Sequence, residues 1–144
     1  SISVVENQSE LNVYRTEQFI EKMFPVDIRY NLNIDCEVTQ KGFRSYCLRY
    51  MLANNIKLMK NKSLKFEIKG CDIPGGVKTC DIYWKVRNVG AEAIRLDRIR
   101  GQVIKTNSKI HREHTSFQGA HYVECYLVKN GVCIAKDRIA VPIN

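Results

Sequence analysis

The chain has 144 residues, of which 44% are hydrophobic and 26% charged, and its 23 Lys and Arg exceed its 15 Asp and Glu to give a formal net charge of +8. This length and composition fit one globular domain with its own core and exclude a disordered or fibrous chain. The excess of positive charge favours anionic partners, namely nucleotides, nucleic acids or acidic proteins.

No apolar run approaches the roughly 18 residues of a membrane span, and residues 1–6 lack the basic and apolar regions of a signal peptide. We therefore predict a soluble, cytoplasmic protein without a membrane partner. A first residue of Ser instead of Met indicates a piece of a longer chain or a processed product. The longest basic stretch, residues 57–62, is short and mixed, which predicts a solvated face and not a polybasic tail.

The six cysteines contain no C-x-x-C pair and match no zinc spacing. They stand at positions 36, 47, 71, 80, 125 and 133. Four of the six lie beside aliphatic or aromatic residues in periodic segments, as buried reduced thiols do in cytosolic proteins. Free thiols are expected, and a disulfide framework is the less favoured alternative.

The first half of the chain predicts helices and strands in alternation. Residues 9–24 form an amphipathic pattern that Pro25 ends, with Thr16 and Glu17 as cap and first turn. Residues 26–38 alternate apolar and polar side chains without a break, which is the clearest strand pattern in the chain. Residues 43–52 then show helical spacing, residues 64–68 alternate again, and the glycines of 70–76 predict a turn.

The second half predicts strands alone. Residues 80–87 and 121–128 alternate, residues 99–104 continue the sheet, and Asn130-Gly131 marks a hairpin before residues 132–143. With Trp84 on an inward face, these elements predict a mainly β fold, an antiparallel Ig-like β-sandwich flanked by two helices. A parallel βαβ arrangement is disfavoured because the later connections are too short for helices.

We expect one folded unit over residues 1–144. Within it, residues 1–62 are expected to form a helical and strand flank that packs on the sandwich core of residues 63–144. No internal repeat or low-complexity segment divides the chain further.

No motif gives positive support for catalysis. His111, Glu113, His114 and His121 are residue types that metal or acid–base sites use, but the histidine spacing is not H-E-x-x-H, so a solvated polar loop or an anion contact is expected instead. Residues 74–79 look like a phosphate loop without its spacing and predict a turn. A nucleophile elbow and a kinase motif set are absent from the sequence. We therefore expect no enzyme activity, no metal and no cofactor.

Arginines, amides and a histidine gather at predicted strand ends and predict an anion site. They are Arg87, Asn88, Arg100, Gln102, Arg112 and His121, with Gly101 and Gly119 beside them. Arginine matches phosphate with a planar fork, amides can contact a base edge, and glycine lets a ligand approach the backbone. The alternative is that the arginines cover the surface and pair with Glu92, Asp97 or Glu124, and composition alone slightly favours it.

Three strings resemble a known family. Residues 83–93 hold the motif W-K-V-R-N-x-G, residues 99–103 hold R-G-Q, and residues 121–126 read H-Y-V-E-C-Y. Together with residues 24–30 and 35–44, these strings are similar to the adenylyl/guanylyl and SMODS C-terminal sensor domain (AGS-C) over nearly the whole chain. In that family the domain follows a bacterial nucleotidyltransferase of the cGAS/DncV-like class, in anti-phage systems such as CBASS, and is thought to sense nucleotides.

The resemblance implies a regulatory sensor domain that binds a cyclic oligonucleotide or a related nucleotide without covalent chemistry. Its implied partner is the nucleotidyltransferase domain of the parent chain, whose acidic metal-binding motif is absent here. The motif positions carried over as ligand contacts are Trp84, Arg87, Asn88, Arg100, Gln102 and His121, with Trp84 more a core residue than a stacking platform. The alternatives are an RNA- or DNA-binding module, which the charge permits, and a protein-interaction module.

Overall fold

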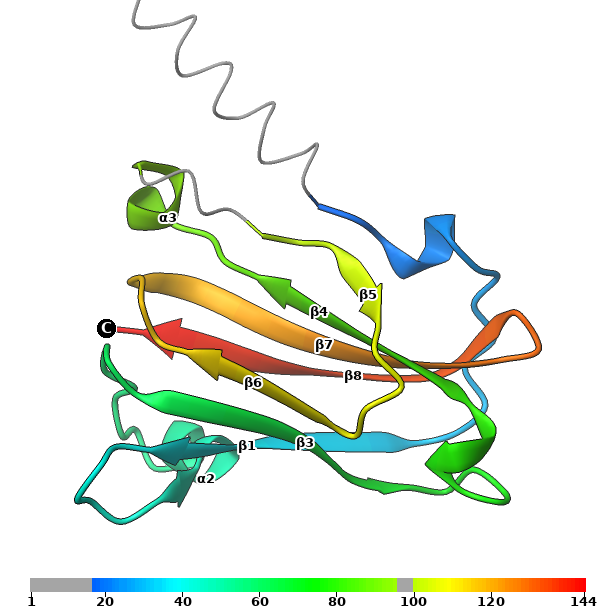
Figure 1. Cartoon of the computed structure of the whole chain (residues 1–144), viewed down its shortest axis with the longest axis horizontal. Helices are drawn as coiled ribbons and strands as arrows, with labels where there is room; N and C mark the ends of the chain where they lie inside the picture. Colours follow the sequence, from blue (N-terminus) through cyan, green and yellow to red (C-terminus); the bar gives the residue numbers. More distant parts are fainter. Residues whose placement is uncertain (1–16, 96–99) are drawn as a thin grey trace, which may run out of the picture.

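Two four-stranded antiparallel sheets pack face to face in the computed structural model, which describes residues 17–95 and 100–144 (Figure 1). Sheet A has the strand order β5-β4-β7-β8 and consists of β4 (Asp81–Arg87), β5 (Val103–Lys105), β7 (Gly119–Lys129) and β8 (Val132–Ile143). Sheet B has the order β2-β1-β3-β6 and consists of β1 (Leu32–Thr39), β2 (Tyr46–Cys47), β3 (Ser63–Cys71) and β6 (Ile110–His114). The predicted antiparallel β-sandwich is confirmed.

Within residues 17–95 and 100–144, two short α-helices and two 3₁₀ turns accompany the sheets. They are α2 (Leu48–Ala53), α3 (Ala91–Arg95), η1 (Ile20–Lys22) and η2 (Val77–Thr79). Because β1 pairs with β3 along its whole length, the predicted division at residue 62 falls between two neighbouring strands of sheet B. The sandwich therefore draws on both sides of that division.

The core lies between the sheets and follows the alternation of the strands. Trp84 is only 2% exposed, and its indole Nε1 donates a hydrogen bond to the carbonyl oxygen of Ser108 at 2.8 Å. Phe66 and Ile34 from sheet B pack in the same cluster. This confirms Trp84 as a core residue. The hairpin at Asn130-Gly131 is confirmed as well, because both residues have the positive φ angles, 51° and 74°, that a two-residue turn of this type requires.

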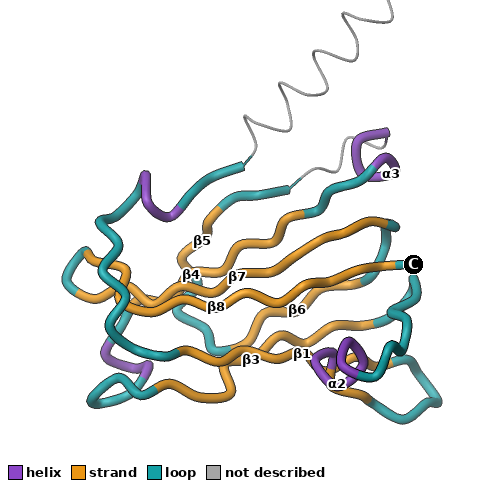
Figure 2. The backbone as a smooth tube through the Cα atoms, turned by 180° about the vertical axis from the view of Figure 1, so that it is seen from behind, coloured by secondary structure: helices purple, strands orange, loops and turns teal. Residues whose placement is uncertain are grey.

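Part of the outer face of sheet A is also buried, because residues 17–30 cross it (Figures 1 and 2). At the β5 side, the backbone N–H of Gln18 donates to the carbonyl oxygen of Gly101 at 2.9 Å. At the β8 side, the N–H of Asp27 donates to the carbonyl oxygen of Cys133 at 2.9 Å. The segment thus satisfies backbone groups beside β5 and at the start of β8, the two edge strands of sheet A.

Several predicted elements are corrected. The helix over 9–24 is wrong for residues 17–24, which form extended backbone and η1, with Gln18 hydrogen-bonded to Gly101 and Val103 at the β5 side; residues 9–16 lie outside the described residues. The strand predicted over 26–38 begins only at Leu32, the first residue of β1, and the helix predicted over 43–52 begins only at Leu48, the first residue of α2. The polar segment 111–114 is not a loop but strand β6, because β3 offers it a pairing edge. The short helix α3 was not predicted.

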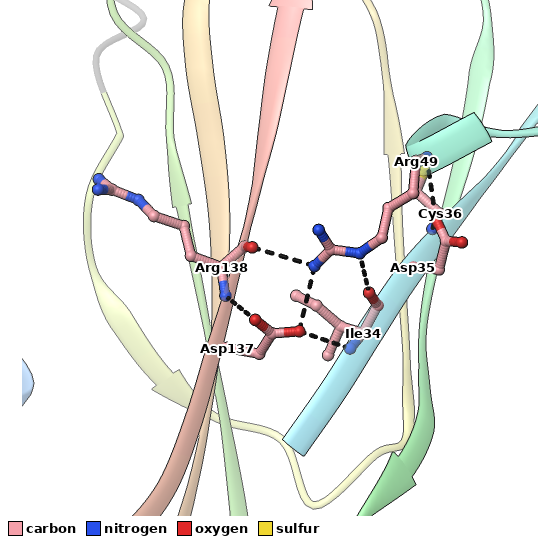
Figure 3. A network of polar contacts seen from close by, with 6 residues as sticks. All are labelled: Ile34, Asp35, Cys36, Arg49, Asp137 and Arg138. Atoms are coloured by element: carbon pink, nitrogen blue, oxygen red, sulfur yellow. Dashed lines mark hydrogen bonds and ion pairs between the residues drawn. The ribbon is translucent and has the colours of Figure 1, made fainter. Parts of the chain in front are cut away.

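An arginine–carboxylate clasp joins the sheets on the side where β1 and β8 face each other (Figure 3). Arg49 on α2 donates from Nε to the carbonyl oxygen of Ile34 at 2.8 Å and from Nη2 to Asp137 Oδ2 at 3.1 Å. The same carboxylate oxygen accepts the backbone N–H of Ile34 at 2.8 Å. A register shift between Asn33 and Ile34 interrupts the β1–β3 ladder at this point, and the clasp satisfies the backbone there.

Candidate ligand site at the β5 and β6 edge

The W-K-V-R motif of β4 divides between the two faces of sheet A. Trp84 and Val86 face sheet B, whereas Lys85 and Arg87 point to the outer face beneath residues 17–30. The Lys85 and Arg87 side chains are 2% and 3% exposed. Two buried cations are costly unless a carboxylate pairs with them. This half of the motif therefore depends on an acidic partner.

Glu17 is that partner. Its Oε1 accepts hydrogen bonds from Lys85 Nζ at 3.1 Å and from the Tyr122 hydroxyl at 2.6 Å, and its Oε2 lies 3.6 Å from Arg87 Nη2. Burial raises the pKa of Glu17, but the hydrogen bonds from Tyr122 and Lys85 and the two positive charges outweigh it and lower the pKa overall. Burial and the same carboxylate raise the pKa of Tyr122 to about 12. From its sequence position, Glu17 was expected only at the cap and first turn of a helix.

Arg100 forms a second clasp, on the side of the sandwich opposite Asp137, where β5 and β6 face each other. Its Nη1 donates to both oxygens of Glu113, at 2.9 and 3.0 Å. His111 Nε2 lies 2.8 Å from Glu113 Oε1, and its ring stacks on Trp84 with centroids 5.9 Å apart. Burial raises the pKa of Glu113, but the hydrogen bond from His111 and the charge of Arg100 lower it overall. The Arg100 side chain stays 41% exposed, so this pairing does not enclose it fully.

His121 has both ring nitrogens occupied. Its Nδ1 accepts the backbone N–H of Val89 at 2.8 Å, so Nε2 carries the proton and donates to the carbonyl oxygen of Phe117 at 2.7 Å. The neighbouring Gly119 has φ 144°, and a Cβ there would lie 2.3 Å from the Val89 oxygen. Gly119 thus allows a close approach of backbone, as predicted for a ligand, but the approaching group is the Val89 carbonyl of the protein itself.

Arg112 lies apart from the other predicted residues. Its register with Lys65 places it on the outer face of sheet B, whereas Glu113 and His111 face the core opposite Leu64 and Phe66. Arg87, Arg100 and Arg112 consequently occupy the outer face of sheet A, the β5–β6 edge and the outer face of sheet B. The three arginines share no single cleft in the described part of the chain.

Two small hollows are lined by several of the predicted residues. Trp84, Arg100, Gln102 and His111 line a hollow of about 50 Å³. Asn88 and His121 line another of about 20 Å³. Sites for nucleotide-sized ligands usually measure about 300 Å³ or more. Arg100, whose side chain is 41% exposed, and the exposed Gln102 line the same hollow, so these two predicted residues can contact one ligand together.

Two wider hollows are lined by basic side chains that the sequence reasoning did not assign. One, of about 400 Å³, has Lys69, Lys78 and Lys109 around the glycines of the 70–76 turn. The other, of about 310 Å³, we call the basic aromatic groove. It is lined by Val38, Thr39, Gln40, Phe43, Arg44, Tyr46, Met51, Lys57, Met59 and Lys62. The signal that could have found the groove is the basic stretch 57–62 together with the aromatic residues of 43–46.

Other kinds of site find little support in residues 17–95 and 100–144. No group of three His, Cys, Asp or Glu side chains there could hold a metal ion. All six cysteines, which fall within these ranges, are free thiols, and three of them are buried. No helix described by the structure is long and apolar enough to cross a membrane.

Comparison with known families settles the affiliation. The model of the Adenylyl/Guanylyl and SMODS C-terminal sensor domain matches residues 14–144. The chain belongs to this family. The sensor domain is also similar to the Cyclic GMP-AMP synthase of Escherichia albertii, with 36% identity over 58 residues. That stretch is 40% of the sensor domain and 13% of the synthase, so the similarity covers a small part of the relative's length. The resemblance inferred from the sequence motifs is confirmed.

Proposed function

We propose that this sensor domain binds a nucleotide, in the first instance a cyclic oligonucleotide, and reports its presence to a nucleotidyltransferase domain of the same parent chain. The observation that carries the proposal is the family match over residues 14–144. A relative that is a Cyclic GMP-AMP synthase supports a nucleotidyltransferase as the partner. We place the domain in a cytoplasmic bacterial anti-phage system, and we assign it binding and no covalent chemistry.

The chemistry of the described surface is compatible with an anionic ligand. The domain carries a net charge of +8, and basic side chains line each of its two wider hollows. From the residues predicted by sequence, Arg100 and Gln102 are proposed as contacts, because a guanidinium and an amide at one exposed edge can bind phosphate and a base edge. Trp84, Arg87, Asn88 and His121 would then act by holding this edge, and Arg112 would contact ligand only from another face.

Thermal unfolding with a nucleotide panel tests the proposal. A ligand at one hundred times its Kd stabilises the folded state by about 2.7 kcal/mol, which is a shift of several degrees in Tm. We expect such a shift for at least one of 3′,3′-cyclic GMP–AMP, cyclic di-AMP, cyclic di-GMP, ATP and GTP. An unchanged Tm with every nucleotide at millimolar concentration contradicts the proposal.

Nucleic-acid binding is the second candidate, and the charge of +8 is the observation that favours it. It predicts affinity for RNA or DNA that falls steeply with salt, because each neutralised phosphate releases counterions. Fluorescence anisotropy with a labelled 12-nucleotide RNA at 50 and 200 mM salt measures this. If the protein binds a small nucleotide with a weak salt dependence and does not bind the RNA, the first candidate is favoured.

A further inference from the structure

The basic aromatic groove lies at one end of sheet B, between two loops that the β1–β3 pairing brings together. One loop, residues 40–45, connects β1 to β2, and the other, residues 54–62, connects α2 to β3. The second loop is fastened by the fully buried Thr115, whose hydroxyl oxygen accepts the N–H of Lys62 at 2.8 Å and donates to the carbonyl oxygen of Met59 at 3.0 Å. The groove therefore has a wall that is formed before any ligand arrives.

The charged residues of the groove are all cations. Arg44, Lys57 and Lys62 line it, and no Asp or Glu among the described residues does. Within β1, Glu37 points to the face of sheet B opposite to the groove residues Val38 and Tyr46, where it pairs with Lys65 and Cys47. At the β5–β6 edge, by contrast, Glu113 pairs with Arg100 and neutralises its charge. An anion consequently meets a stronger positive field in the groove than at that edge.

Aromatic rings stand beside these cations and are open to solvent. Phe43 is 73% exposed and Tyr46 is 44% exposed, which is a high exposure for large apolar side chains so close together. The Tyr46 ring stacks with Tyr50 at a centroid distance of 6.4 Å, and the Arg44 guanidinium lies 5.9 Å from the centre of the Tyr46 ring. Rings alternating with cations are the arrangement on which nucleobases stack while their phosphates bind Lys or Arg.

The size of the groove separates it from the other hollows. Its volume of about 310 Å³ suits a small ligand, whereas the hollows beside Arg100 and His121 measure about 50 and 20 Å³. The hollow around Lys78 is larger, at about 400 Å³, but no aromatic side chain lines it. Among these four hollows, only the groove joins nucleotide size, several cations and exposed rings.

We infer that the basic aromatic groove is a nucleotide site of this domain, separate from the β5–β6 edge to which the sequence motifs point. Phe43 and Tyr46 stack on a base, Arg44, Lys57 and Lys62 hold phosphate, and the side-chain amide of Gln40, which already accepts a hydrogen bond from Lys62, offers its N–H₂ group to a base edge. The inference rests on the proposed function, since it names the place where the proposed ligand binds.

Binding of 3′,3′-cyclic GMP–AMP and ATP to the whole chain, followed by isothermal titration calorimetry, tests the inference. Phe43→Ala and Lys57→Ala should each weaken binding about tenfold or more, as loss of a stacked base or of a charge-assisted hydrogen bond does. The matched controls are Ile28→Ala, which trims an exposed apolar side chain elsewhere, and Lys136→Ala, which removes an exposed charge from β8. Both controls should change affinity less than twofold.

The outcomes separate this inference from the proposed function. If the unmodified chain binds neither probe, the proposed function fails for these ligands, and the assignment of the groove as their site fails with it. If the chain binds but Phe43→Ala and Lys57→Ala leave the affinity unchanged while Arg100→Ala weakens it, the function stands and the groove is refuted as its site. If both groove variants abolish binding of a 12-nucleotide RNA and neither affects a nucleotide, the assignment to a small nucleotide is overturned.

Discussion

Replacing Glu17 by Gln should destabilise the domain, because Glu17 forms ion pairs with two buried cations, Lys85 and Arg87. Lys85 has 2% of its side chain exposed, and its Nζ lies 3.1 Å from Glu17 and 3.8 Å from Glu124. The amide in Glu17→Gln keeps an acceptor for the Tyr122 hydroxyl but removes the negative charge. The buried ammonium then depends on the more distant Glu124.

The expected loss follows from the burial of the pair. Removing one partner of a fully buried ion pair costs about 3 to 5 kcal/mol. Glu124 remains and Glu17 itself keeps 17% exposure, so we expect a smaller loss than this range, about 2 kcal/mol. At about 3 to 4 °C per kcal/mol for a domain of this size, the Tm should fall by about 7 °C. Glu21→Gln, a substitution at an exposed position of the same segment, should leave the Tm unchanged.

The pH dependence and a double variant identify the cause. The pKa of Glu17 is lowered in the folded state, so its charge stabilises the fold at neutral pH and this contribution is lost as the pH falls through that lowered value. The Tm difference between Glu17→Gln and the unmodified chain should be full at pH 7 and shrink below about pH 4. Adding Lys85→Met should recover part of the loss, because it removes the buried ammonium that Glu17 pairs with. Differential scanning calorimetry measures all of this, and a Glu17→Gln protein that melts within about 1 °C of the unmodified chain at pH 7 refutes the reasoning.

Three further predictions concern the fold and its thiols. Asp137→Ala should lower the free energy of unfolding by about 2 kcal/mol in urea, because it leaves a β1 backbone N–H without its acceptor; an unchanged midpoint would exclude the clasp as a stabilising feature. Gly119→Ala should lower the free energy of unfolding by at least about 2 kcal/mol, because its Cβ would lie 2.3 Å from a backbone oxygen. Gly70→Ala, where a Cβ meets open space, should lower it by less than half as much. Equal losses of stability in urea would contradict this. At pH 8 Ellman's reagent should modify the exposed Cys47 rapidly and Cys36, whose pKa burial raises to about 12, only after unfolding; equal rates would show that the core is open.

The later strands could be predicted from the sequence because their side chains alternate and their turns have specific chemistry. Residues 121–128 alternate, and Asn130-Gly131 tolerates the positive φ angles of a tight hairpin. Such signals are local, so they hold whatever the strand packs against. They were sufficient for the sandwich class and for the inward face of Trp84.

The early elements could not be predicted because their hydrogen bonds are formed with distant parts of the chain. The pattern of residues 17–24 is helical, but the side chain and backbone of Gln18 bond to Val103 and Gly101 of the β5 region. Phe43 has the spacing of a helical core residue, yet it lies in a loop and is 73% exposed. Tertiary contacts overrode local propensity in both places.

For the candidate site, the sequence identified residue types but not their surroundings. Arginine binds phosphate and carboxylate alike. The sequence alone could therefore not show that Arg87 and Arg100 pair with Glu17 and Glu113 instead of standing ready for a phosphate. Alternation on β4 predicted one polar face, and it gave no sign that another segment would bury Lys85 there. Partners far away in sequence decide which cations remain available to a ligand.

Nucleotide binding is tested most directly by titrating the ¹⁵N-labelled chain with 3′,3′-cyclic GMP–AMP and ATP and following its backbone amide resonances. We predict saturable shifts concentrated in residues 40–46 and 57–62, the loops that form the basic aromatic groove. Amide resonances that stay unchanged throughout the domain at millimolar nucleotide would contradict the account.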